Sequence, residues 1–230
     1  MSTRPVPAPR TCEAMYVVLT PTSLGQDDTL PLPHAALLRH HGTPEGAIEQ
    51  MEDLHHQHVV HGRVPLAQAA EHARTTRIEV LRLAEQHEGL VIDLTVPRIL
   101  QMSSDEVSLA HATQWYVLDA GAVLDGVLQT DGLVQFGLPE VRITGVEAAG
   151  RAATGAVVAG LAHRLIAEWP ENDPVGPASV TLRDIAHGLG DPQAEQTPTV
   201  PALPLTIEHD AEAGVLAVTL EADPVTTLFA

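Results

Sequence analysis

A histidine-rich tract holds the residues best suited to metal chemistry. Its candidate ligands are Glu52, His55, His56, His58 and His61. If the tract is helical, Glu52 shares one face with His55 and His56, and His58 lies one turn before His61. Imidazole and carboxylate groups at this spacing bind Zn or Ni, which would make the protein a metal-dependent hydrolase. The residue order differs from the H-E-x-x-H zinc motif, and a solvated helix face is the competing interpretation.

A second candidate is the segment from Gly145 to Gly150, whose glycine spacing matches that of a phosphate-binding loop. It follows a predicted strand and opens a predicted helix, as such loops do. The positions that carry the chemistry differ, because Arg151 replaces the phosphate-binding lysine and Ala152 replaces the magnesium-binding hydroxyl. Glu147 would also repel a phosphate. The segment therefore predicts a tight turn, and we expect no cofactor apart from the Zn or Ni considered above.

Other catalytic patterns are missing from the sequence. It contains no G-x-S-x-G elbow, no C-x-x-C pair and no lysine that could act as a nucleophile. The adjacent carboxylates Asp27 and Asp28 are expected to be solvated, and Trp115 and Trp169 are typical of core or interface anchors. Sequence order leaves open a catalytic site assembled from distant residues.

The charge of the chain limits its partners. The formal net charge is −18, and all 12 basic residues are arginine. Residues 101–230 hold 18 acidic residues and 4 arginines, whereas residues 1–100 hold 12 and 8. Nucleic acids and anionic membranes are bound by clustered basic side chains, so we expect neither as a partner. A basic protein partner or a cation fits this charge, and so does simple solubility of an acidic protein.

The N-terminal sequence and the single cysteine bear on location. Residues 1–10 contain no apolar run of the kind that signal peptides have, and the longest apolar run, at 155–162, is too short to cross a membrane. Cys12 has no second cysteine with which to form an internal disulfide. We therefore expect a cytoplasmic protein.

Hydrophobic periodicity and turn residues predict the elements that would position these groups. Strands are expected at 14–20, 90–94, 123–129, 133–136, 141–144, 179–182, 205–209 and 215–221. Helices are expected at 34–41, 44–61, 65–88, 105–116, 147–169 and 184–189, with Ser104 as an N-cap. The predicted organisation is a disordered tail at 1–10, a main domain at 11–190, a proline-rich linker at 191–204 and a C-terminal hairpin at 205–230.

Because strands and helices mix without strict alternation, the sequence predicts an α+β fold. We expect a largely antiparallel sheet with helices packed on one face, plus the C-terminal β-hairpin. In the helix at 147–169, the small residues Ala149, Ala153, Ala156 and Gly160 form one stripe that should contact the sheet, while Thr154 should point outward.

The Asp131-Gly132 pair lies between two apolar runs and predicts a hairpin turn, in which Gly132 adopts a positive φ. The surrounding residues resemble a signature of an uncharacterised bacterial family of unknown function. In that signature a Thr-x-Gly-Leu hairpin precedes Phe-Gly and Pro-Glu, and the matching residues here are Thr130, Gly132, Leu133, Phe136, Gly137, Pro139 and Glu140. The resemblance implies an architecture and no activity.

Together these observations favour a non-enzymatic acidic protein of unknown biological role. It would act through protein–protein contacts, either with a different protein or with a second copy in a homo-oligomer. A metal-dependent hydrolase that uses His55–His61 is the first alternative. An immunity-type protein that neutralises a basic toxin is the second.

Overall fold

The computed structural model describes residues 6–25, 27–119 and 126–229, which divide into two compact units. The N-terminal unit is Arg10–Val107, and the C-terminal unit combines the described residues before Arg10 with those after Val107. The sequence predicts residues 11–190 as one domain, whereas this boundary falls inside that range. The physical reason is that the range contributes strands to two separate sheets.

The two segments expected to lack packing contribute to the C-terminal unit. The predicted tail is described from Val6 onward, and residues 1–5 lie outside the described chain. Val6 is fully buried, and its backbone N–H donates to Asp173 Oδ2 at 3.5 Å. The predicted linker at 191–204 contains the short 3-10 helix η6 (Ala194–Gln196), whose Ala194 is buried.

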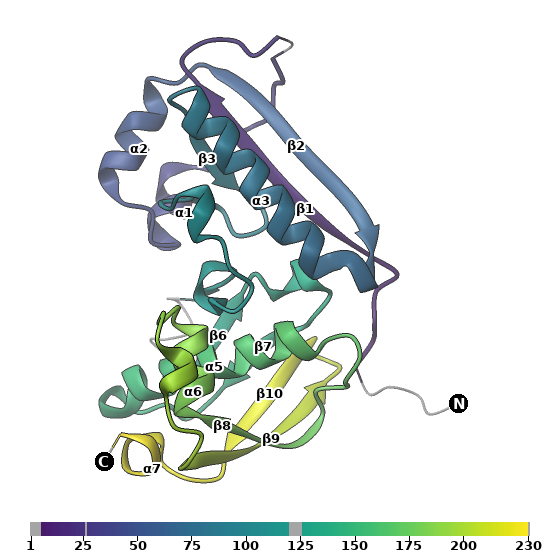
Figure 1. The fold of residues 1–230 in the computed structure, drawn as a ribbon, viewed down its shortest axis with the longest axis vertical. Helices are drawn as coiled ribbons and strands as arrows, with labels where there is room; N and C mark the ends of the chain where they lie inside the picture. Colours follow the sequence, from purple (N-terminus) through teal and green to yellow (C-terminus); the bar gives the residue numbers. More distant parts are fainter. Residues whose placement is uncertain (1–5, 26, 120–125, 230) are drawn as a thin grey trace. The chain divides into compact units, whose positions relative to one another are not determined.

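The N-terminal unit contains a four-stranded antiparallel sheet in the order β2-β1-β3-β4 (Figure 1). Its strands are β1 (Thr11–Thr20), β2 (His56–Pro65), β3 (Leu90–Asp93) and β4 (Arg98–Ile99). Its helices are α1 (Ala35–His40), α2 (Glu45–Glu52) and α3 (Ala69–Gln86), with 3-10 turns η1 (Leu66–Gln68) and η2 (Ser104–Glu106).

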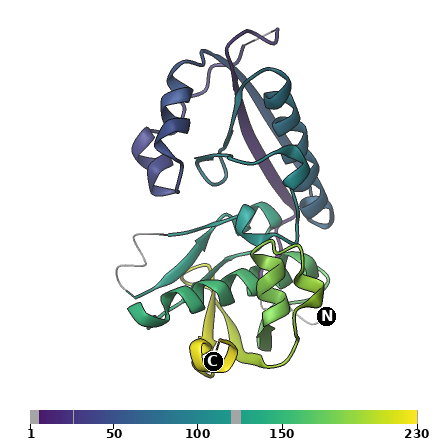
Figure 2. The same cartoon turned by 60° about the vertical axis from the view of Figure 1, so that its left-hand side comes forward.

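Helices cover both faces of this sheet. Within the unit, α3 lies on one side of β1, and α1 and α2 lie on the other (Figure 2). Val17 and Leu19 of β1 pack with Leu38 of α1 and Ile48 of α2. Burial on two faces explains why β1 is a continuous apolar run without alternation.

A buried ion pair joins α3 to the sheet. Arg77 Nη2 of α3 lies 2.6 Å from Asp93 Oδ2 of β3, and neither side chain is exposed to solvent. Arg77 Nε also donates to the Tyr16 hydroxyl of β1. Burial, followed by the charge of Arg77, lowers the pKa of Arg98 to about 10. The interior of this unit therefore contains a buried ion pair in addition to its apolar core.

The C-terminal unit contains a six-stranded sheet in the order β5-β6-β7-β10-β9-β8. Its strands are β5 (Val117–Leu118), β6 (Leu128–Asp131), β7 (Glu140–Ile143), β8 (Gly176–Thr181), β9 (Ala202–Asp210) and β10 (Val215–Leu220). Its helices are α5 (Arg151–Glu168), α6 (Leu182–Gly188) and α7 (Pro224–Leu228), with 3-10 helices η3 (Ala112–Gln114), η4 (Leu133–Phe136) and η5 (Ala148–Gly150). The β7–β10 pair is parallel, and the other pairs described are antiparallel.

Alternation along β9 separates the two faces of this second sheet. Leu203, Leu205 and Ile207 are buried, whereas Pro204 and Glu208 are exposed. Figure 1 shows α5 and α6 side by side over strands of this unit. The sheet therefore has one apolar face, as the sequence predicts.

The face by which α5 packs differs from the predicted one. Thr154 was expected to point outward, but it is buried and its hydroxyl donates to the Gly150 carbonyl. Val157, Leu161 and Leu165 are buried beside it. The larger apolar side chains take the core positions because they remove more apolar surface from water than alanine does.

The closest approach of α5 is to α6, where glycine is required. A Cβ atom at Gly188 would lie 2.2 Å from the Ala159 carbonyl oxygen, and one at Gly160 would lie 2.9 Å from the backbone nitrogen of Ile185. Of the predicted small-residue stripe, Gly160 thus makes a close contact, whereas Ala149 is exposed.

The α+β class and the C-terminal hairpin, formed by β9 and β10, are confirmed. The helix predicted at 105–116 is wrong, since two short 3-10 turns, η2 and η3, occupy this stretch. Ser103, and not Ser104, caps η2, and Glu106 closes the capping box. Among the described residues, no helix combines the length and apolar character that crossing a bilayer requires.

Candidate functional site

The predicted hairpin at Asp131-Gly132 is wrong in its second arm. Gly132 has a positive φ of 135°, as the turn prediction requires. The following residues, 133–136, form the 3-10 helix η4 instead of a strand, and β6 pairs with β5 and β7. The first predicted arm, 123–129, is described only from residue 126 onward.

A carboxylate explains this local structure. Glu140 Oε1 accepts the backbone N–H groups of Gly132 at 2.9 Å and Val134 at 3.3 Å, and its Oε2 accepts the Thr130 hydroxyl at 2.6 Å. The Thr130 hydroxyl oxygen accepts the Val141 N–H in turn. Burial raises the pKa of Glu140, and the hydrogen bonds from Thr130 and Gly132 oppose that rise. Thr130, Gly132 and Glu140 of the signature therefore belong to one hydrogen-bonded structural unit.

The histidine tract forms a strand instead of the predicted helix. Successive side chains of a strand point to opposite faces, so His56 and His58 share one face of β2 and His61 lies on the other. Glu52 ends α2, and His55 lies in the turn that follows. The five predicted ligands are not brought together. Among the described residues, no three His, Cys, Asp or Glu side chains are grouped closely enough to hold a metal ion.

Carboxylates from elsewhere in the N-terminal unit contact this strand. His56 Nδ1 lies 2.7 Å from Asp27 Oδ2, and His61 Nε2 lies 3.3 Å from Glu13 Oε2. Asp28 Oδ2 accepts the Val59 N–H at 2.8 Å. Asp27 is exposed, as expected, and Asp28 is half-buried, and both contact the outer edge of β2. Such a cover protects a sheet edge from pairing with other chains.

A second histidine cluster lies in the C-terminal unit, and its sequence positions give no signal of it. The rings of His163 in α5 and His187 in α6 stack with centroids 4.9 Å apart. His163 Nδ1 lies 3.1 Å from the Ala110 carbonyl oxygen, and His187 Nε2 lies 3.4 Å from Glu195 Oε1. Burial, and then the neighbouring His187, lower the pKa of His163. Both effects disfavour the protonated form of His163.

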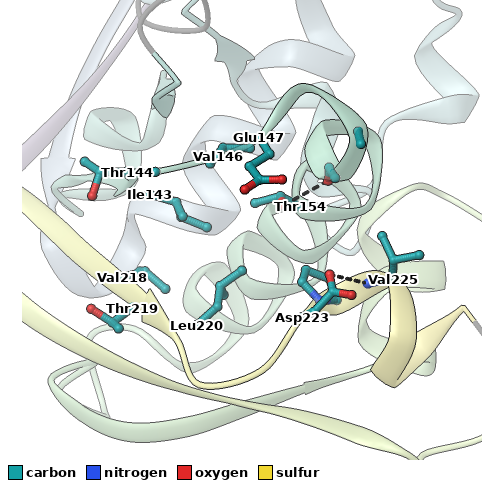
Figure 3. A pocket seen from close by; sticks show the side chains of 14 residues that line it. Ile143, Thr144, Val146, Glu147, Thr154, Val218, Thr219, Leu220, Asp223 and Val225 are labelled. Atoms are coloured by element: carbon teal, nitrogen blue, oxygen red, sulfur yellow. Dashed lines mark hydrogen bonds between the residues drawn. The ribbon is translucent and has the colours of Figure 1, made fainter.

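A candidate binding site is a pocket in the C-terminal unit, at the carboxyl ends of the parallel strands β7 and β10 (Figure 3). Both strands run to the same edge of the sheet, and a helix follows each of them. The carboxyl ends of parallel strands are a common position for ligand sites. The cavity volume of about 680 Å³ lies within the range of small-molecule and peptide pockets.

Apolar side chains and hydroxyl groups line most of the pocket. The apolar lining residues are Ile143, Val146, Ala149, Val218, Leu220, Pro224 and Val225, and the hydroxyl groups belong to Thr144, Thr154 and Thr219. Glycines at 145 and 150 complete the lining. The walls can therefore bury an apolar group and offer a few hydroxyl oxygens around it.

The charged groups of the lining are two carboxylates. Asp223 caps α7 by accepting the N–H groups of Val225 at 3.2 Å and Thr226 at 3.3 Å, and these bonds lower the pKa of Asp223. Glu147 is exposed, and no described residue makes a hydrogen bond or ion pair with its carboxylate. In Figure 3 the Glu147 side chain points into the pocket from the β7–α5 loop. The described lining contains no arginine, lysine, histidine or cysteine.

The pocket includes the Gly145–Gly150 segment that was compared with a phosphate-binding loop. Gly145 has a φ of 72°, and η5 leads directly into α5. A lining whose described residues include two carboxylates and no cation makes the cavity unsuited to phosphate and suited to a cationic or neutral group. The half of the site contributed by 218–225 gives no sequence signal, because only the parallel pairing of β10 with β7 brings it to the loop.

Comparison with known proteins adds no relative. No family model matches the chain, and neither the curated proteins nor the solved structures contain a match. The resemblance of 130–140 to a family signature thus stands on the short motif alone.

Proposed function

We propose that the protein is a non-enzymatic acidic binding protein that acts through contact with a basic protein partner, and that the C-terminal unit makes the contact. The observation that carries this proposal is the pocket at the ends of β7 and β10, whose charged lining groups are Glu147 and Asp223. Neutralisation of a basic toxin is one form that such a contact would take.

The charge of the surrounding unit supports the proposal. Residues 108–230 contain 16 acidic residues and 4 arginines. Three of the arginines bind within the unit: Arg142 to Gln129, Arg164 to Glu168 and Arg183 to the Thr197 carbonyl. Acidic surface without free cations attracts basic partners and accelerates their association. Two copies of a chain with a charge of −18 repel each other, which favours a different protein over a homo-oligomer.

The arrangement of the predicted metal ligands gives no support to the metal-dependent hydrolase, because β2 places His56 and His61 on opposite faces. Likewise, we expect nucleic acid to be excluded by the same negative charge that attracts a basic protein.

Selection from a random peptide library tests this function. We expect the peptides that bind the protein at about 150 mM salt to be enriched in arginine and lysine. At that salt concentration the screening length is about 8 Å, so only basic groups close to the acidic side chains are attracted. Duplex DNA at the same salt concentration is the matched negative probe and should not be retained. Enrichment of acidic or uncharged peptides would contradict the proposal.

A further inference from the structure

We propose that the pocket at the ends of β7 and β10 receives an arginine side chain of the basic partner, with an apolar residue of the same segment packed beside it. This inference rests on the proposed function and specifies the chemistry of its contact. It identifies Glu147 as the group that pairs with the guanidinium.

The first argument is the shape of the lining. Ile143, Val218 and Leu220 come from the ends of two strands and form an apolar wall. An aliphatic stem that lies against such a wall keeps its charged head toward the more polar rim, as long basic side chains do at protein surfaces. An anionic or strongly polar ligand would gain nothing from that wall.

The second argument is that Glu147 has bonding capacity to spare. Asp223 already accepts two backbone N–H groups of α7, so its carboxylate is partly committed. Glu147 lies at the start of η5 and makes no side-chain capping bond there. An ionised carboxylate can accept two parallel bonds from a guanidinium, and Asp223 adds a second negative charge to the same cavity.

Arginine suits the site better than lysine. Its planar guanidinium is less strongly hydrated than an ammonium group, donates bidentate bonds at its edge and packs its face on apolar side chains. The pocket offers a contact for each part of a guanidinium: the Glu147 carboxylate for its edge, and an apolar wall that includes Val146 for its face.

The size of the cavity and its rim explain the accompanying apolar residue. A volume of about 680 Å³ exceeds what one side chain fills. Val225 lines the pocket with 40% of its surface exposed. Large apolar side chains left exposed at the edge of a pocket are typical of contact surfaces.

The test is a titration of the ¹⁵N-labelled full chain with acetyl-Leu-Arg-Leu-amide, followed by amide chemical shifts. The matched probe replaces arginine by citrulline, which has the same shape and no charge. We expect the arginine peptide to shift the resonances of 143–147 and 218–225 and the citrulline peptide to bind about three- to five-fold more weakly, as for a surface ion pair. Butylguanidinium, a free guanidinium with a short alkyl chain and the same single charge, distinguishes a small-molecule ligand from a peptide segment.

Three variants distinguish binding in the pocket from attraction to the overall negative charge of the protein. Glu147→Gln should weaken the arginine peptide to the level of the citrulline peptide and leave the latter unchanged. Ala149→Trp keeps the charge and fills the cavity from an exposed position, so both peptides should lose binding. Glu212→Gln, an equal change of charge at an exposed residue outside the lining, should alter binding less than two-fold because distant charges are screened.

Each contrary result has one meaning. If basic peptides are selected from the library but these shifts do not appear up to about 10 mM peptide, beyond the range of weak specific binding, the proposed function stands and the pocket is not its anchor. Equal effects of Glu147→Gln and Glu212→Gln would overturn the anchor in the same way. Butylguanidinium binding as tightly as the peptide would show that a peptide segment is not required, and would overturn that part of the proposal. Failure to select basic peptides overturns the proposed function itself.

Discussion

Each unit holds a carboxylate in place with several hydrogen bonds, and the two units do so by different means. Asp93 is fully buried, whereas Glu140 is half-buried. In the N-terminal unit, Asp93 is paired with the buried guanidinium of Arg77, and its Oδ1 also accepts the backbone N–H groups of Thr95 and Val96. In the C-terminal unit, Glu140 is held by the Thr130 hydroxyl and by backbone N–H groups, without a cation. A full charge pair can satisfy a carboxylate at any position where the two side chains meet, whereas neutral donors must be placed by the local backbone.

This difference explains why the two sites leave different marks on the sequence. Arg77 and Asp93 are separated by 16 residues and belong to a helix and a strand. The partners of Glu140 lie within ten residues of it and include Thr130 and Gly132 of the signature. The arrangement around Glu140 therefore appears in the sequence as a compact motif, whereas the Arg77–Asp93 pair does not.

The largest expected effect comes from removing the charge of Asp93. Asp93→Asn leaves Arg77 buried without its counterion and should lower the free energy of unfolding by about 3–5 kcal/mol. Circular dichroism during chemical denaturation measures the loss. Asp105→Asn, at an exposed position, is the control and should cost less than about 0.5 kcal/mol. A loss below about 1 kcal/mol at Asp93 would show that the charge pair contributes little.

A smaller loss is expected for the neutral arrangement. Glu140→Ala removes the acceptor of three donors and should cost about 2–3 kcal/mol, because buried donors are left without partners. Tryptophan fluorescence reports this, since Trp115 and Trp169 both belong to the C-terminal unit. Glu140→Gln keeps one acceptor oxygen and should be milder. Equal losses for the two variants would mean that hydrogen bonding is not what Glu140 supplies.

Helix contacts extend the comparison from charges to packing. Gly188→Ala in the C-terminal unit places a methyl group against the Ala159 carbonyl and should cost about 1–3 kcal/mol. Gly46 in α2 of the N-terminal unit has open space around it, so Gly46→Ala should stabilise by about 0.5–1 kcal/mol. Thermal denaturation gives both values. The assignment of a tight α5–α6 contact fails if both variants are stabilised.

The smallest expected effect is a pH dependence that belongs to the C-terminal unit. The pKa of His163 lies below its usual value because of burial and of the charge of His187. The folded state therefore binds this proton less readily than the unfolded state. Its contribution to stability is complete above about pH 6.5 and is lost as the pH falls through the folded pKa. Denaturation midpoints from pH 7.5 to 5 should fall less steeply in His163→Gln, and an unchanged slope would contradict the assignment.

Sequence periodicity predicts the elements that have a strong local cause. The apolar run at 14–20, the helix that becomes α3 and the hairpin of β9 and β10 each combine a clear pattern with a stop signal such as Gly89 or Gly214. These three are confirmed. They are also elements whose burial follows directly from the order of their residues.

The remaining errors come from partners that are distant in the sequence. The 56–65 segment has helical spacing of polar residues, yet its pairing with β1 makes it a strand. The spacing of α5 predicts an outward Thr154, yet this residue is buried and lines the pocket together with residues of β10 and α7, which come much later in the sequence. The pocket joins 143–150 to 218–225 across the parallel β7–β10 pair, and no local pattern encodes a pairing of that separation.

The division of the chain also has a consequence for its synthesis on the ribosome. The N-terminal unit is one continuous stretch, so every strand of its sheet has been translated by Val107. Val6 is translated before all of them, and the carboxylate that accepts its N–H, Asp173, follows 167 residues later. Domains fold as units during translation. The N-terminal unit can thus complete its core while Val6 still awaits the segment that buries it.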